Sequence, residues 1–195
     1  AALDLITSFE SEKIAGQAFS KLSKSDIALG LKARLTNPAI VNQAGLNACG
    51  PAAAIYIFAS TDPVGYVQAA INLFKNGKAK YHDYAVDVGS DLKKHGPNDY
   101  KWPGTKPDPI DWMVLSSLRD AENWFYDFEG GPAEDFSAIT MPGEMEDWLK
   151  EFIGFKKVEN DTNLFFTKNM SHLNRVNEMY ASGSFVVLFI NADML

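Results

Sequence analysis

The sequence predicts an α+β fold, and two observations support this prediction. Hydrophobic residues make up 46% of the 195 residues, with 13 Phe, 7 Tyr and 4 Trp, which is enough apolar material for a core. Helical patterns come first along the chain, and short strands mixed with helices follow. Because we find no internal repeat and no low-complexity linker, we expect a single domain over residues 1–195.

The N-terminal segment is expected to be helical and to lead into a loop. Residues 3–35 have a weak helical pattern, in which Ser25 is a suitable N-cap for Asp26–Leu35 and Pro38 ends the stretch. Residues 39–48 are rich in Asn, Gln and Gly, which is typical of a loop.

Two helices are expected after this loop. A compact run of alanines and large aliphatic residues over Gly50–Ala59 predicts a buried helix, in which Pro51 is tolerated only in the first turn. The next helix has Asp62 as its cap and Pro63 as its first residue, and it ends at Gly77.

The second half of the chain alternates between segment types. Lys93–Pro109 holds four prolines and two glycines, which predicts a long irregular segment. Further helices are expected over Asp108–Arg119, Thr140–Phe152 and Ser171–Ala181, the last of which ends at Gly183. Short strands are expected over Tyr81–Val88, Phe155–Glu159, Leu164–Lys168 and Phe185–Ile190.

Charge and composition exclude several classes of function. The 18 basic and 25 acidic residues give a formal net charge of −7, which disfavours binding to a phosphate backbone, so we expect no nucleic-acid partner. No segment approaches the roughly 20 consecutive apolar residues of a membrane span. The N-terminal stretch lacks the pattern of a Sec signal peptide, and the sequence leaves localisation open.

The sequence also predicts no cofactor and no metal site. A single cysteine and three scattered histidines make no zinc pattern, and Gly130-Gly131-Pro132 is a turn rather than a phosphate-binding loop. The acidic group Glu144, Glu146 and Asp147 lies at a helix start, where carboxylates are favoured without any metal. A further group of aromatic residues is expected to pack in the core or at its rim: Trp112, Trp124, Phe125, Tyr126 and Phe128.

The most informative stretch surrounds Cys49, which stands between the loop and the start of the buried helix. A helix N-terminus stabilises a thiolate, because its unpaired N–H groups and its dipole favour an anion. The Cys49 N–H and the side-chain amide of Gln43, six residues upstream, can together donate to a substrate oxyanion. The alternatives are a small buried cysteine and a hydrogen-bonding loop glutamine, while Asn47 is expected to be a turn residue.

This arrangement resembles the papain-like cysteine hydrolases. A Gln six positions before Cys49-Gly50-Pro51-Ala52-Ala53 is similar to the C39-like bacterial branch, while papain's own signature around its cysteine is absent. The resemblance implies a papain-like fold with a small C-terminal antiparallel sheet, with Cys49 as the nucleophile and Gln43 in the oxyanion hole. Asp62-Pro63, Asp111-Trp112 and the run from Ser117 to Asp120 resemble papain-like toxin domains attached to bacterial secretion systems.

The resemblance does not supply a catalytic base from this chain. In the family the histidine follows the equivalent of Phe185–Ile190, and the sequence ends five residues later, so we expect that histidine to lie beyond Leu195. Of the internal histidines, His82 has the most suitable neighbours, Asp83 and Asp87, and it is the internal candidate for the base. His95 and His172 are weaker candidates.

Three functions remain open at the level of sequence. The first is a papain-like cysteine protease that cleaves an amide bond in a protein or peptide substrate, as a bacterial toxin or effector delivered by a specialised secretion system. The second is a catalytically incomplete module that binds an immunity protein or another partner protein. The third is the same thiol chemistry applied to a glutamine side chain, in deamidation, or to a peptidoglycan peptide.

Overall fold

The computed structural model describes residues 1–122, 130–132, 140–162 and 170–189. The chain divides into two compact units, Ala1–Val158 and Glu159–Leu195. The expected strand Leu164–Lys168 and four aromatic residues lie outside the described residues: Trp124, Phe125, Tyr126 and Phe128.

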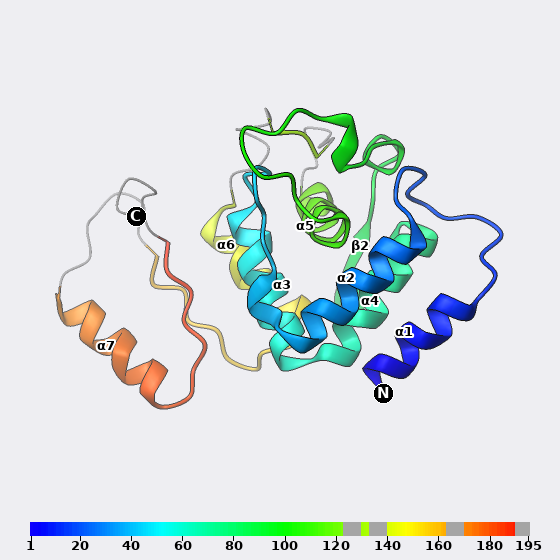
Figure 1. The fold of residues 1–195 in the computed structure, drawn as a ribbon. Coiled ribbons are helices and arrows are strands. Elements are labelled where there is room, and N and C mark those ends of the chain that lie inside the picture. Colours follow the sequence, from blue (N-terminus) through cyan, green and yellow to red (C-terminus); the bar gives the residue numbers. More distant parts are fainter. Residues whose placement is uncertain (123–129, 133–139, 163–169, 190–195) are drawn as a thin grey trace. The chain divides into compact units, whose positions relative to one another are not determined.

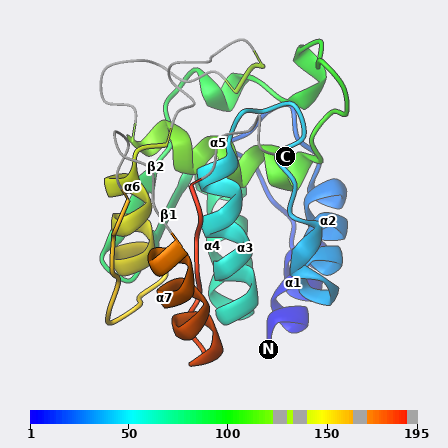
Figure 2. The same ribbon diagram turned by 90° about the vertical axis from the view of Figure 1, so that its left-hand side faces the viewer.

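The first unit is helix-rich with one small antiparallel sheet, so the α+β prediction is confirmed at that level (Figure 1). Its helices are α1 (Ala2–Ser11), α2 (Lys24–Thr36), α3 (Cys49–Thr61), α4 (Pro63–Asn76), α5 (Pro109–Glu122) and α6 (Pro142–Asp147). The shorter helical turns in the described part of this unit are η1 (Pro38–Ile40), η2 (Leu92–Lys94), η3 (Pro97–Asp99) and η4 (Trp148–Phe152). The sheet is a hairpin of β1 (Lys78–Tyr81) and β2 (Tyr84–Asp87). Helices α3 and α4 lie side by side and α5 crosses them (Figure 2).

Local capping signals placed several helix ends correctly. The Asp62 side chain accepts a hydrogen bond from the Gly65 N–H at 2.9 Å, Pro63 is the first residue of α4, and Gly77 ends it at φ 67°. One cap differs: Ser23, not Ser25, accepts the hydrogen bond from the Asp26 N–H, so α2 begins at Lys24. Two serines only two residues apart offer the same chemistry, and the sequence alone does not choose between them.

The strand predictions were less accurate than the helix predictions. Tyr81–Val88 is not one strand, because His82 and Asp83 form the turn of the hairpin. Phe155–Glu159 and the described part of the last expected strand, 185–189, form no strand in the structure. A strand exists only when a second segment pairs with it, and apolar or β-branched composition does not identify that partner.

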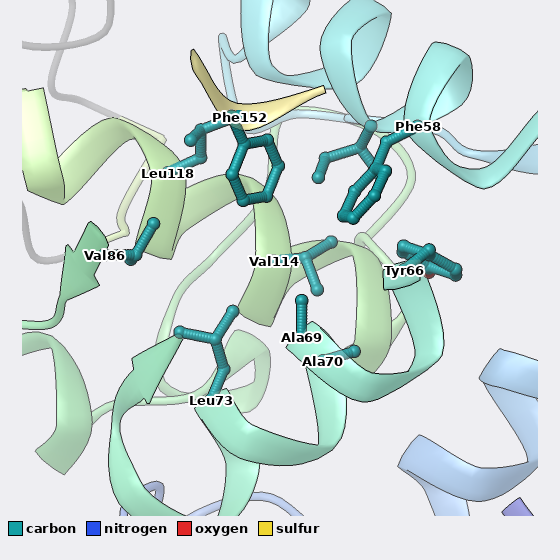
Figure 3. Close-up of a pocket in the computed structure, with 10 residues that line it drawn as sticks. Phe58, Tyr66, Ala69, Ala70, Leu73, Val86, Val114, Leu118 and Phe152 are labelled. Carbon is teal, nitrogen blue, oxygen red and sulfur yellow. The ribbon is translucent and has the colours of Figure 1, made fainter. Parts of the chain in front are cut away.

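The core of the first unit lies between α3, α4, α5, β2 and η4. Phe58, Tyr66, Val114, Leu118 and Phe152 surround a small apolar cavity at its centre (Figure 3). The cavity volume is about 10 Å³, about the least that holds one water molecule. This core buries the inner face of α3 and so fixes the helix that begins at Cys49.

The second unit contains α7 (Met170–Ala181), which confirms the helix expected over Ser171–Ala181. The helix is followed by a turn in which Gly183 has φ 92°. An ion pair of 2.6 Å joins Arg175 of α7 to Glu159. Among the residues that the structure describes, neither unit contains a helix with the length and apolar character needed to cross a bilayer.

We expect Leu118→Ala to lower the free energy of unfolding by about 2–5 kcal/mol, because it enlarges a cavity that Leu118, only 2% exposed, helps to line. Urea unfolding followed by circular dichroism measures this change. Leu29→Ala is the matched control, since Leu29 on α2 is 69% exposed and its truncation is expected to cost less than about 0.5 kcal/mol. Equal losses in the two variants would contradict this description of the core.

Candidate active site

Cys49 is the first residue of α3, and its side chain is exposed while the body of the helix is buried. The alternative that Cys49 is a small buried core residue is therefore excluded. The preceding residue, Ala48, provides no side-chain cap, and the first bond of the helix runs from the Ala52 N–H to the Ala48 carbonyl at 2.9 Å. Pro51 has no N–H. Because the first helical bond starts at Ala52, the N–H groups of Cys49 and Gly50 have no acceptor among the described residues. Both belong to the helix start that carries the thiol.

The loop that precedes Cys49 turns back on itself. The Leu46 N–H donates to the Gln43 carbonyl at 3.0 Å, which closes a four-residue turn from Gln43 to Leu46. Within this turn Ala44 has φ 50°, and Asn47, just after it, has φ 51°. Asn tolerates the left-handed conformation well, as expected for a turn residue, whereas Ala does so at a cost.

Gln43 lies in this turn with its side chain partly buried. Its Oε1 atom is buried and has no hydrogen-bond partner among the described residues. Gln43 is therefore not simply solvated at the surface. Its carboxamide oxygen is buried on the segment that leads directly into Cys49.

A buried ion pair anchors the start of this loop. The Asp111 carboxylate at the start of α5 is fully buried, and Arg34 at the end of α2 is 3% exposed. The two are joined through both carboxylate oxygens, with Nε to Oδ1 at 2.9 Å and Nη2 to Oδ2 at 2.6 Å. Arg34 Nη2 also donates to Asp108 at 2.7 Å. The Asn42 N–H donates a third hydrogen bond to Asp111, at 2.9 Å to Oδ2.

Burial sets the direction of the pKa shift of Asp111 and Tyr66 but not that of Arg34. It raises the pKa of the Asp111 carboxyl above its usual value, although the charge of Arg34 and the hydrogen bond from Asn42 act in the opposite direction. Burial also works to lower the pKa of Arg34, but its bonds to Asp111 and Asp108 outweigh this effect, so that pKa is raised. The Tyr66 hydroxyl on α4 interacts electrostatically with both Asp111 and Arg34. Burial raises the pKa of this hydroxyl well above the ordinary value, and the negative charge of Asp111 adds to that shift.

A second buried arginine positions the segment that covers the start of α3. Arg119 of α5 donates to both oxygens of Glu144, at 2.8 and 2.7 Å, and the Met141 N–H donates to the same carboxylate at 2.8 Å. The neighbouring Thr140 is 7% exposed and lies directly on Gly50, where a Cβ would stand 2.2 Å from Thr140 Oγ1. Gly50 therefore cannot carry a side chain without moving Thr140.

Sequence reasoning did not identify Thr140, Arg34 or Asp111 as neighbours of the site. The glycine that directly follows Cys49 is the one signal that could have indicated a close approach by another segment. Nothing in the sequence names the segment that approaches.

His82, the internal candidate for the base, lies in the turn of the β1–β2 hairpin. The preceding ring, Tyr81, packs 4.8 Å from Phe58, and His82 itself lies over Gly154. Phe58 is nine residues beyond Cys49, which at about 1.5 Å per residue is roughly 14 Å along the axis of α3. The structure therefore does not bring His82 and Cys49 together.

Of the other two histidines, His95 contacts residues other than Cys49, and His172 belongs to the second unit. His95 follows η2, with its ring 5.8 Å from that of Tyr100 and its Nδ1 3.8 Å from Asp99. His172 lies in the first turn of α7 in the second unit. Within the described residues of the first unit, no hydrogen bond joins Cys49 to His82 or His95.

The remaining sequence candidates have structural partners. Glu144 pairs with Arg119 and Glu146 with Lys150, and Trp112 is fully buried with its Nε1 donating to the Gly130 carbonyl at 2.9 Å. Among the residues described, no group of three or more acidic, His or Cys side chains is arranged to hold a metal ion. Comparisons with protein-family models, with curated proteins and with solved structures found no match to this chain.

We expect Gly50→Ala to lower stability by about 1–3 kcal/mol, because its Cβ would overlap Thr140. The double variant Gly50→Ala/Thr140→Ala should recover part of this loss, since it removes the clashing atoms. Gly143→Ala is the control, because no atom lies within 4 Å of its added Cβ. The coupling free energy comes from thermal unfolding of four proteins: the parent, Gly50→Ala, Thr140→Ala and the double variant. Strictly additive losses of stability would refute the contact.

Tyr66→Phe tests the polar cluster, because the Tyr66 hydroxyl is buried and lacks a hydrogen-bond partner in the described part of the chain. Removing it should leave stability at neutral pH unchanged or raise it by up to about 1 kcal/mol. The raised folded-state pKa contributes stability that is complete below the unfolded value near 10 and is lost as the pH rises above it. Stability of the variant should therefore fall less between about pH 9 and 11.

The matched control for this experiment is Tyr56→Phe, since Tyr56 on α3 is exposed. Urea unfolding at several pH values measures both effects. Identical alkaline profiles for the Tyr66→Phe, Tyr56→Phe and parent proteins would be inconsistent with the burial of Tyr66 in this cluster.

Proposed function

We propose that the chain is a papain-like thiol hydrolase in which Cys49 attacks the carbonyl carbon of an amide bond. The observation that carries this proposal is the exposed thiol at the first residue of a buried 13-residue helix, next to two N–H groups without acceptors among the described residues. An exposed cysteine at such a position has both access to substrate and a favourable environment for its thiolate.

The reaction follows from the groups around the thiol. The thiolate forms a C–S bond to the substrate carbonyl carbon, and the negative charge moves to the carbonyl oxygen. The N–H groups of Cys49 and Gly50 stabilise that oxyanion, and the Gln43 amide is a further donor. The C–N bond then breaks and the amine leaves with a proton from a general acid. Water hydrolyses the resulting thioester, which releases a carboxylic acid and restores the thiol.

This mechanism requires a histidine that the described part of the first unit does not bring to Cys49. His82 lies near the far end of α3, and His95 is engaged with Tyr100 and Asp99. The proposal therefore assigns no histidine of this chain as the base. Proton transfer by such a group contributes typically about 10²- to 10⁴-fold to the rate.

The substrate class is a protein or peptide amide, and the resemblance favours a bacterial toxin or effector. The net charge of −7 favours neutral or basic protein surfaces over acidic ones. The same thiol chemistry would also serve deamidation of a glutamine side chain or cleavage of a peptidoglycan peptide.

The second candidate function is a binding module without catalysis, whose partner is an immunity protein or another protein. The absence of a histidine bonded to Cys49 within the described residues of the first unit is the observation that favours it. The two candidates differ in one measurable property, because turnover requires the thiol and binding alone does not.

We expect Cys49→Ala to abolish turnover and labelling by iodoacetamide, because Cys49 is the sole cysteine of the chain. Gln43→Ala should lower kcat by about 10²-fold while KM changes little, since the amide acts on the oxyanion. Gln43→Glu is the matched variant of similar size without the N–H donor. Assays should follow peptide cleavage and ammonia release separately. Turnover that persists in Cys49→Ala would refute the proposal, and partner binding without turnover would favour the second candidate.

A further inference from the structure

The turn before Cys49 contains a strained backbone conformation at Ala44. Ala44 lies at φ 50°, where the Cβ of an L-residue crowds the backbone. A non-glycine residue in this region costs about 1–3 kcal/mol and persists only where the surroundings hold it. Since this turn carries Gln43 and leads into the thiol, what holds it decides the geometry of the site.

Two sets of hydrogen bonds hold the turn. In the first set, Asn42 Oδ1 accepts the Ala44 N–H at 2.7 Å, while the Asn42 N–H donates to Asp111 at 2.9 Å. In the second, the Gly45 N–H donates to the Thr105 carbonyl at 3.3 Å. The Asp111 bond is the one that ends on a fully buried group.

Asp111 is itself immobilised by its partner. Both carboxylate oxygens are taken by Arg34, and Oδ2 accepts the Asn42 N–H in addition. The ion pair between α2 and α5 would be complete without Asn42. The third bond is therefore what joins the junction of these two helices to the loop.

We infer that Asp111 is a positioning residue for Cys49: through the Asn42 N–H it holds the Gln43–Leu46 turn in the strained form that precedes the head of α3. The effect on catalysis rests on the proposed function. The effect on the order of the turn does not, and it can be measured without any substrate.

The primary variants are Asp111→Asn and its matched control Asp108→Asn. Both remove a carboxylate from Arg34, but Asp108 is 64% exposed and does not bond the loop. A second pair of variants tests the same hydrogen bond in case Asp111→Asn does not fold. Asn42→Pro removes the N–H donor and leaves the ion pair intact, and Asn42→Ala removes the same side chain but keeps the N–H. Val41, at φ −55° and ψ 121°, has a backbone conformation that a following proline accepts.

The first readout is amide hydrogen exchange of Ala44, Gly45 and Leu46. Exchange should be faster by about tenfold in Asp111→Asn than in Asp108→Asn, and likewise faster in Asn42→Pro than in Asn42→Ala. The second readout is turnover, for which kcat should fall by about 10- to 100-fold in Asp111→Asn with a much smaller change in KM. A purely structural role would lower the amount of folded protein and leave kcat per folded molecule unchanged.

Each outcome decides one of the two proposals. Equal exchange within both pairs would overturn the inference, even if Cys49 proves to be the nucleophile. Faster exchange with an unchanged kcat per folded molecule would also overturn it, because the turn would then not position the thiol. If no Cys49-dependent turnover exists, the proposed function fails, and the exchange data alone decide whether Asp111 holds the turn.

Discussion

The buried carboxylate of Asp111 is the constraint on which the first unit depends. It binds Arg34 through both oxygens and so joins the end of α2 to the start of α5. It also accepts a hydrogen bond from the Asn42 N–H, in the loop that leads to Cys49. Burying two charges is costly, and removing one partner of such a pair typically costs about 3–5 kcal/mol. A pair of this kind is therefore weak evidence for added stability, but it specifies one arrangement of three segments.

Helix α5 carries a second pair of the same type, two turns further along. Arg119 holds Glu144 and the Met141 backbone, and this places Thr140 against Gly50. Two charged side chains of α5 thus anchor segments next to the start of α3: Asp111 holds Asn42 of the preceding loop, and Arg119 holds the segment that carries Thr140. Cys49 itself is exposed, while the helix that it begins is buried, so solvent reaches the thiol.

The proposed thiol chemistry needs a nucleophile and N–H donors from one part of the protein and a general base from another. The nucleophile and the N–H donors come from one helix start and the loop before it, all within a short stretch of sequence. A general base in papain-like enzymes comes from a distant strand. Under the proposed function, the described residues supply the nucleophile and the N–H donors of such a site.

Local patterns in the sequence were sufficient for the helix that begins at Cys49 and for the helix from Pro63 to Gly77, because proline, capping side chains and glycine act on their own turn of backbone. The pairing of Gln43 with Cys49 stays a prediction from the sequence. The tertiary structure alone decided that Asp111 meets Arg34 and Asn42, that Thr140 covers Gly50, that His82 lies away from the thiol, and which segments form strands. These contacts join residues far apart in the chain, and their partners are selected by packing, which no local pattern records.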